Sequence, residues 1–135
     1  MRAHLDAISA RLAPLEYVTH FFAAPEVSSQ YLVLGSRSWG DQVEVGLVGD
    51  TSLDTEVQVK AVAGTPMGVE VMLRRARGLL CPDGQWASLP VPGRSARITF
   101  ARSEFITTDI DVTITGTNRH PGVGVDSYRL VSEPV

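Results

Sequence analysis

The stretch Asp54-Thr-Glu-Val-Gln-Val-Lys-Ala-Val-Ala63, followed by Gly-Thr-Pro66 and the segment 67–80, decides the fold. Apolar and polar side chains alternate along its first part, which predicts a β-strand with one face in the core and the other mostly solvated. Thr65 can cap the free amide groups of a helix, and Pro66 suits the first helical position, which needs no amide donor. A strand and a helix therefore meet at a Gly-Thr-Pro junction.

Two segments have the apolar spacing of an amphipathic helix. The segment after Pro66 repeats its apolar residues at that spacing and ends in the turn Cys81-Pro-Asp-Gly84. Residues 2–13 repeat Leu5, Ile8 and Leu12 in the same way, and a proline closes the pattern. We expect one helix in each segment.

The remaining elements are predicted to be strands and loops. Apolar, aromatic and β-branched runs predict strands at residues 16–23, 30–35, 97–102, 104–115 and 123–131. Glycines and acids predict an extended arm at 36–52, and Pro90, Pro92 and Gly93 predict a proline-rich loop at 85–94. The order predicts an α+β fold, a mainly antiparallel sheet with two helices packed on one face.

The composition predicts one domain spanning residues 1–135. Of these 135 residues, 44% are hydrophobic and 20% are charged, an ordinary globular mix. A formal net charge of -3 and the lack of a Lys/Arg run disfavour a role in gripping nucleic acid. The single Cys81 fits a reducing compartment, and no apolar run reaches the roughly 20 residues that span a bilayer. These features predict a protein made in a cytoplasm.

No catalytic or metal-binding set can be assembled from the sequence. His4, His20 and His120 lack a carboxylate, serine or cysteine at the spacing of a recognised catalytic motif. Asp109 and Asp111 are expected to share one face of a strand, which we interpret as a solvated face rather than a metal site. The chain is expected not to be an enzyme and to need no cofactor.

The pattern of the whole chain resembles the tail-terminator (tail-completion) proteins of bacteriophages with long, non-contractile tails. The resemblance is carried by the opening amphipathic helix and by Thr55-Glu-Val-Gln-Val-Lys-Ala-Val-Ala63 running through Gly-Thr-Pro66 into the helix 67–80. The segment Thr113-Ile-Thr-Gly-Thr-Asn-Arg-His-Pro-Gly-Val-Gly-Val-Asp-Ser-Tyr-Arg-Leu130 is similar to the closing strands of such proteins in phages of actinobacteria. The arm at 36–52 and the loop at 85–94 match no pattern of that family.

The resemblance implies a tail-terminator-like fold and a virion protein of the tail neck, assembled in the host cytoplasm. It implies a homohexameric ring that caps the tail tube, stops its polymerisation and joins the tail to a head-side connector or stopper protein. The tail tube protein is then a partner, and genomic DNA passes through the lumen without specific binding. No membrane is involved. Asp109 and Asp111 are the candidates for the lumen, and the candidates for interfaces are Trp39, Val43, Val45, Leu47, Arg119 and His120.

Two other classes of function remain open. A head-completion stopper protein of the neck has a similar size, acidity and lack of catalytic chemistry. A small ligand-binding α+β domain would require a concave pocket with convergent polar groups.

Overall fold

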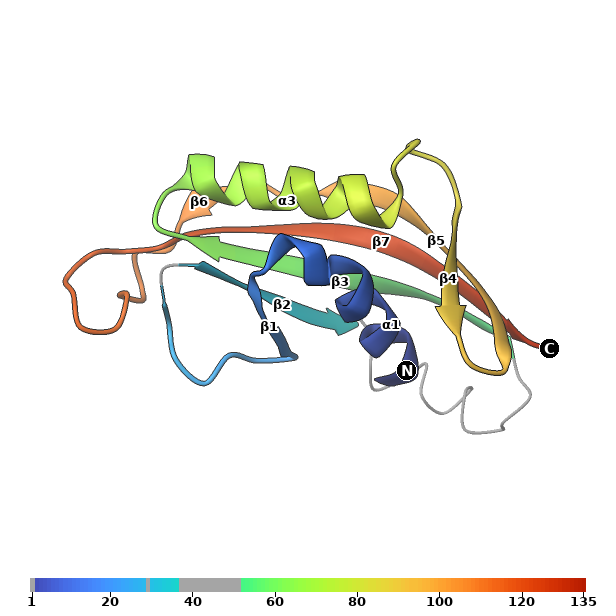
Figure 1. Ribbon diagram of the computed structural model, residues 1–135. Helices are drawn as coiled ribbons and strands as arrows, with labels where there is room; N and C mark the ends of the chain where they lie inside the picture. The colour runs from blue at the N-terminus through green and yellow to red at the C-terminus, as the bar shows by residue number, and fades with distance from the viewer. Residues whose placement is uncertain (1, 29, 37–51) are drawn as a thin grey trace.

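The computed structural model describes residues 2–28, 30–36 and 52–135, and these form α1, α3 and a seven-stranded sheet (Figure 1). In chain order the elements are α1 (Arg2–Leu12), the 3-10 turn η1 (Ala13–Leu15), β1 (Val18–Phe21), β2 (Gln30–Ser36), β3 (Leu53–Ala63), α3 (Pro66–Leu80), β4 (Ala87–Val91), β5 (Arg94–Ser103), β6 (Thr107–Thr108) and β7 (Gly122–Pro134). The predicted α+β class is confirmed.

The sheet is curled and mixed, with the strand order β1-β2-β3-β7-β5-β4 (Figure 1). The short strand β6 pairs with the beginning of β7. All pairs are antiparallel except β1 and β2, which run parallel. The long strands β3 and β7 lie at the centre, where β3 pairs with β7 from Leu53↔Ser132 to Ala63↔Gly122.

One apolar core joins both helices to the same face of the sheet. The periodic residues of α1 are buried, as are those that follow Pro66 on α3. They pack against alternate residues of the central strands, such as Leu32, Val59 and Leu130. The buried residues of the two helices are Leu5, Ile8, Leu12, Val69, Met72, Leu73, Ala76 and Leu80. Burial of this apolar surface is the main force that holds the helices to the sheet.

The junction between β3 and α3 forms as predicted. The Oγ1 of Thr65 accepts a hydrogen bond from the amide of Gly68 at 3.1 Å, and Pro66 is the first residue of the helix. Gly122, at the start of β7, lies against this junction. A Cβ atom at that position would lie 2.6 Å from the carbonyl carbon of Thr65. The absence of a side chain at Gly122 therefore lets the beginning of α3 approach the sheet.

The proline-rich segment 85–94 is not a loop, contrary to the prediction. It contains β4, which forms a hairpin with β5 through Pro92 and Gly93, whose φ is +73°. β4 is an edge strand, and Pro90 is tolerated there because a strand at an edge needs hydrogen-bond donors on one side only. The prolines are compatible with an edge strand. The sequence pattern alone did not show that this segment lies at the edge of the sheet.

The predicted strand at 104–115 is also wrong, because only Thr107–Thr108 pairs there. After β6 the chain leaves the sheet and returns at Gly122, and Ile110 is 73% exposed. The alternation of Ile110, Val112 and Ile114 therefore does not mark a strand. The predicted arm at 36–52 lies outside the described residues, except for Ser36, which ends β2, and Ser52.

Candidate functional site

The face of the sheet opposite the helices carries most of the charged side chains of the central strands. Arg129 on β7 donates two hydrogen bonds to Asp54 on β3, from Nε to Oδ1 at 3.0 Å and from Nη2 to Oδ2 at 2.7 Å. These bonds hold the pKa of the Asp54 carboxyl below its usual value. Arg102 on β5 forms an ion pair with Glu56 on the same face. This surface is polar and exposed to solvent.

At the β4 end of this face a tryptophan ring lies near two guanidinium groups. The guanidinium carbons of Arg97 and Arg129 lie 5.2 Å and 5.7 Å from the centre of the Trp86 ring. Arg97 is on β5 and Trp86 directly precedes β4. The indole is 41% exposed. We call Trp86, Arg97 and Arg129 the Arg–Trp face. Guanidinium and indole groups are side chains that can bind planar or anionic groups.

Asp109 and Asp111 do not share a strand face. The Oδ1 of Asp109 accepts a hydrogen bond from the backbone amide of Asp111 at 3.1 Å, which closes a local turn. The backbone amide of Asp109 donates to the carbonyl of Pro121 at 2.9 Å, where the chain returns to the sheet. Ile110 and Asp111 point away from the core, since both are exposed. The two carboxylates therefore lie on a projecting turn at the edge of the molecule.

Arg119 and His120 lie in the same excursion from the sheet, between β6 and β7. The Nδ1 of His120 lies 2.7 Å from the carbonyl of Val112, within hydrogen-bonding distance. The carbonyl of Arg119 accepts from the amide of Ile114 at 2.8 Å, and its own amide donates to the Oγ1 of Thr117. Backbone hydrogen bonds thus order this loop. Both side chains are exposed.

The other predicted interface residues lie outside the described residues. They are Trp39, Val43, Val45 and Leu47.

A buried polar cluster between α3 and β7 was not predicted from the sequence. Asp126 on β7 is fully buried; its Oδ2 lies 2.9 Å from Nη2 of Arg77, and its Oδ1 accepts from Ser103 at 2.6 Å. The Arg77 guanidinium also lies over the ring of Phe100, 4.0 Å from its centre. Burial, and then the charge of Asp126, raise the pKa of the neighbouring Tyr128. The cluster ties the C-terminal half of α3 to the middle of the sheet.

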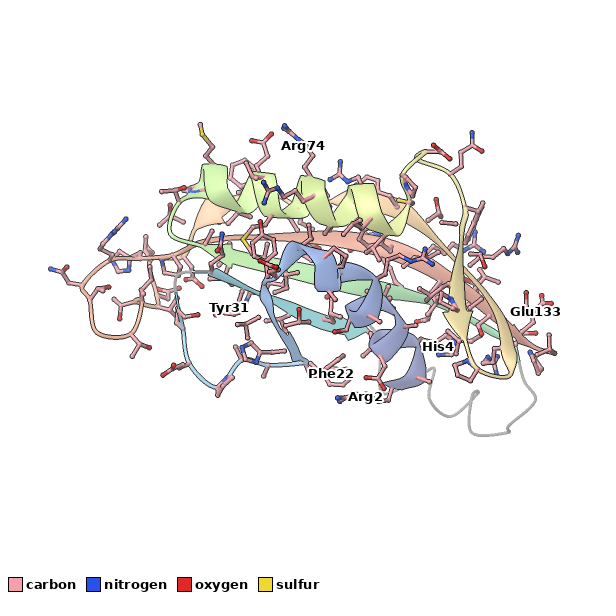
Figure 2. The ribbon with its side chains drawn as sticks, viewed as in Figure 1. Arg2, His4, Phe22, Tyr31, Arg74 and Glu133 are labelled. Atoms are coloured by element: carbon pink, nitrogen blue, oxygen red, sulfur yellow. The ribbon has the colours of Figure 1, made fainter. Side chains whose placement is uncertain are left out.

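A small pocket opens beside this cluster. It has a volume of about 210 Å³, and its lining residues are Glu70, Leu73, Arg74, Arg77, Ser103 and Ile106. Both arginines already have carboxylate partners, since the Nη2 of Arg74 lies 2.6 Å from Glu70 and Arg77 pairs with Asp126. Figure 2 shows Arg74 projecting from the side of α3 away from the sheet. The pocket therefore offers little unpaired charge to a ligand.

A second buried polar contact joins α1 to the end of β7. The Nε2 of His4 lies 2.9 Å from Oγ of Ser132, which also accepts a hydrogen bond from Nε of Arg94 at 2.5 Å. Burial, and then the positive charges of the N-terminus and Arg94, together lower the pKa of His4 to about 4. Ser132 is fully buried. It is therefore closed to an external substrate.

Cys81 is buried at the end of α3, and burial raises the pKa of its thiol. Within the described ranges, no group of three or more His, Cys, Asp or Glu side chains is placed to hold a metal ion. In the same part of the chain, no helix is long and apolar enough to cross a membrane.

Comparison with models of known protein families gives no match, and no curated protein matches the chain. The described residues present two exposed surfaces, the projecting turn around Asp111 and the Arg–Trp face, together with two buried polar contacts.

Proposed function

We propose that this chain is a structural subunit of a phage virion, a tail terminator whose copies close into a ring at the end of the tail tube. One observation carries the proposal. The segments on which the family resemblance rests include α1, β3 with its junction to α3, and residues 122–130 of β7, and these form the core and the centre of the sheet. Residues 113–121 of the closing segment lie in the excursion before β7. A resemblance confined to edge strands and loops would weigh far less, because those parts vary most among related folds.

The exposed chemistry of the described residues is suited to contact with other proteins. The carboxylates near Asp111, the guanidinium groups of the Arg–Trp face and exposed apolar side chains such as Phe105 lie on the surface. Large exposed apolar side chains next to charged groups are typical of interaction surfaces. In the proposed ring, one side contacts the tail tube protein and the other contacts the head-side connector or stopper.

Each copy adds a net charge of -3 to the ring. A ring of six such subunits is anionic, which suits a lumen through which DNA passes without being held. The protein is then found in the tail neck of the virion, after assembly in the host cytoplasm.

Deletion of the gene from the phage genome tests the proposal. We expect over-long tails that are not joined to heads in electron micrographs of the lysate, and normal particles after expression of the intact chain from a plasmid. Negative-stain images of the purified protein should show closed rings, and the resemblance implies that each ring holds six copies. Normal particles from the deletion phage would exclude a terminator. Tails of normal length without heads would instead favour the stopper protein.

The pocket beside Arg77 favours a second candidate, a small ligand-binding domain, because it combines a concave shape with charged groups of both signs. A panel of amino acids and other small zwitterions in a thermal-shift assay tests it. A concentration-dependent rise in melting temperature that is lost in Glu70→Gln would support this candidate. The occupied ion pairs of both arginines make the terminator the better proposal.

A further inference from the structure

The segment 104–111 combines exposed apolar side chains with exposed carboxylates. Phe105 is 88% exposed and Ile110 is 73% exposed. Glu104 and Asp111 are exposed as well, and neither has an ion-pair partner among the residues that the structure describes. We call this segment the acidic tip. Its exposed apolar area is unfavourable in water and is stabilised when a partner covers it.

The Arg–Trp face has the complementary chemistry. Arg97 has no carboxylate partner within the described part of the chain, and it lies over an indole that is 41% exposed. Arg129 is already bound to Asp54, so the guanidinium that remains for a partner is that of Arg97. Trp86 supplies an apolar surface next to that charge. Aromatic residues and arginine are the side chains most enriched where proteins contact each other.

The two surfaces lie toward opposite ends of the molecule. β7 begins beside the acidic tip, where Gly122 pairs with Thr108, and reaches Arg129 only seven residues later, about 23 Å away at the usual rise of a strand. Figure 1 shows β6 at one end of the sheet and the β4–β5 hairpin at the other. One copy therefore cannot close the tip onto its own Arg–Trp face.

We propose that the acidic tip of one copy docks on the Arg–Trp face of the next copy. Ile110 covers Trp86, the carboxylate of Asp111 pairs with Arg97, and Glu104 adds to the negative charge of the tip. A second copy is the occupant because the same chain carries both complementary surfaces, and like charges within either surface prevent it from pairing with itself. The contact is head-to-tail, and such contacts form rings or open filaments. Closure into a ring rests on the function proposed above, whereas the contact itself does not.

This docking changes the role of the two acids that the sequence placed in the lumen. The carboxylate of Asp109 is used within its own turn. Asp111, whose carboxylate has no hydrogen bond within the described part of the chain, is the one that reaches the neighbouring copy. Both acids thus lie at the contact between copies rather than facing the DNA.

Charge reversal on each surface tests the contact. The tip variant is Glu104→Lys with Asp111→Lys, the face variant is Arg97→Glu, and a combined variant carries all three changes. The control is Asp6→Lys with Glu16→Lys, which makes the same change of charge at two other exposed positions, in α1 and directly after η1. Size-exclusion chromatography with light scattering and sedimentation velocity, both at low ionic strength, give the mass and the dissociation constant for self-association.

We expect the wild type and the control to associate equally. The tip and face variants should each associate about tenfold more weakly or worse, because each places like charges opposite one another. Self-association should recover in the combined variant, because its reversed surfaces are again complementary. A variant that merely misfolds would not be rescued by a further mutation. Unchanged association in either single-surface variant, no recovery in the combined variant, or a wild type that stays monomeric at every concentration would each overturn the contact.

These results are distinguishable from the outcome of the gene deletion. Over-long tails in the deletion phage together with unchanged association in the variants would remove this contact and leave the terminator in place. Normal tails in the deletion phage together with recovered association in the combined variant would exclude the terminator and leave the contact between copies in place.

Discussion

Asp126 of β7 and Arg77 of α3 form an ion pair in which the carboxylate is fully buried and the guanidinium is partly exposed, with 2.9 Å between Oδ2 and Nη2. Ser103 donates a hydrogen bond to the other carboxylate oxygen. The pair therefore couples the helix, the central strand and β5 through one charged group. A buried charge is stable only while its partners remain in place.

Removal of that charge should destabilise the protein strongly. Asp126→Asn leaves Arg77 opposite a neutral amide, and we expect the free energy of unfolding to fall by about 3 kcal/mol. Urea denaturation followed by circular dichroism measures the change. The matched control is Asp54→Asn, which breaks the exposed pair with Arg129 and should cost less than about 1 kcal/mol. Equal losses in the two variants would contradict a special role for the buried pair.

Stability should fall in acid because of His4. Its pKa is about 4 in the folded protein and 6.5 without burial, so the folded state keeps the ring neutral while the unfolded state takes up a proton. The stabilising contribution is complete above pH 6.5 and is lost as the pH falls toward 4, by at most about 3 kcal/mol. His4→Gln should flatten the dependence of unfolding free energy on pH between 7 and 4.5. The same slope in both proteins would show that other groups cause it.

The close approach of Gly122 to the start of α3 makes a clear test of packing. Gly122→Ala would place a methyl group 2.6 Å from the Thr65 carbonyl carbon and 2.7 Å from the Pro66 nitrogen, so the helix must shift. We expect a loss of about 1–3 kcal/mol in unfolding free energy. Gly78→Ala, on the exposed side of α3 with nothing within 4 Å, should instead gain about 0.5–1 kcal/mol. Thermal denaturation of the two variants should move in opposite directions, and a shift of the same sign would argue against the packing at Gly122.

Arg119 tests the part of the terminator proposal that concerns partner contacts. Its backbone, rather than its side chain, carries the hydrogen bonds of the loop, so Arg119→Ala should change the unfolding free energy by less than about 0.5 kcal/mol. In a deletion phage complemented with this variant, we expect fewer filled heads joined to tails, because arginine is enriched among the residues that dominate interfaces. Normal particles would remove Arg119 from the proposed interface.

The sequence predicted the parts of the fold that local patterns determine. α1 and α3, β3 and most of β7 follow from apolar spacing, and the start of α3 follows from Thr65 and Pro66. β4 and the excursion after β6 could not be predicted in that way. A proline-containing segment such as β4 pairs only if a suitable strand lies next to it. In the same way, an alternating segment joins the sheet only if a strand is there to pair with it.

The buried cluster, in contrast, left a local signal in the sequence. Asp126 lies two residues before Tyr128, so strand alternation alone places it on the face that packs against the helices. Arg77 lies one turn beyond Leu73 on the helix, close to its buried side. These two positions together were a signal for a buried ion pair. The pairing of Trp86 with Arg97 and Arg129 had no comparable signal, because it depends on strand register.

The pairing of β3 with β7 has a consequence for when the subunit can form. The two strands at the centre of the sheet are separated in the chain by α3, the β4–β5 hairpin and the whole excursion before Gly122. Such long-range pairing must close a large loop before it gains any contacts, which makes folding slow and late compared with local hairpins. During synthesis, β1, β2, β3 and α3 emerge from the ribosome without the strand that completes their sheet. Until β7 has been translated and inserted between β3 and β5, the growing chain has no finished surface with which to recognise another copy.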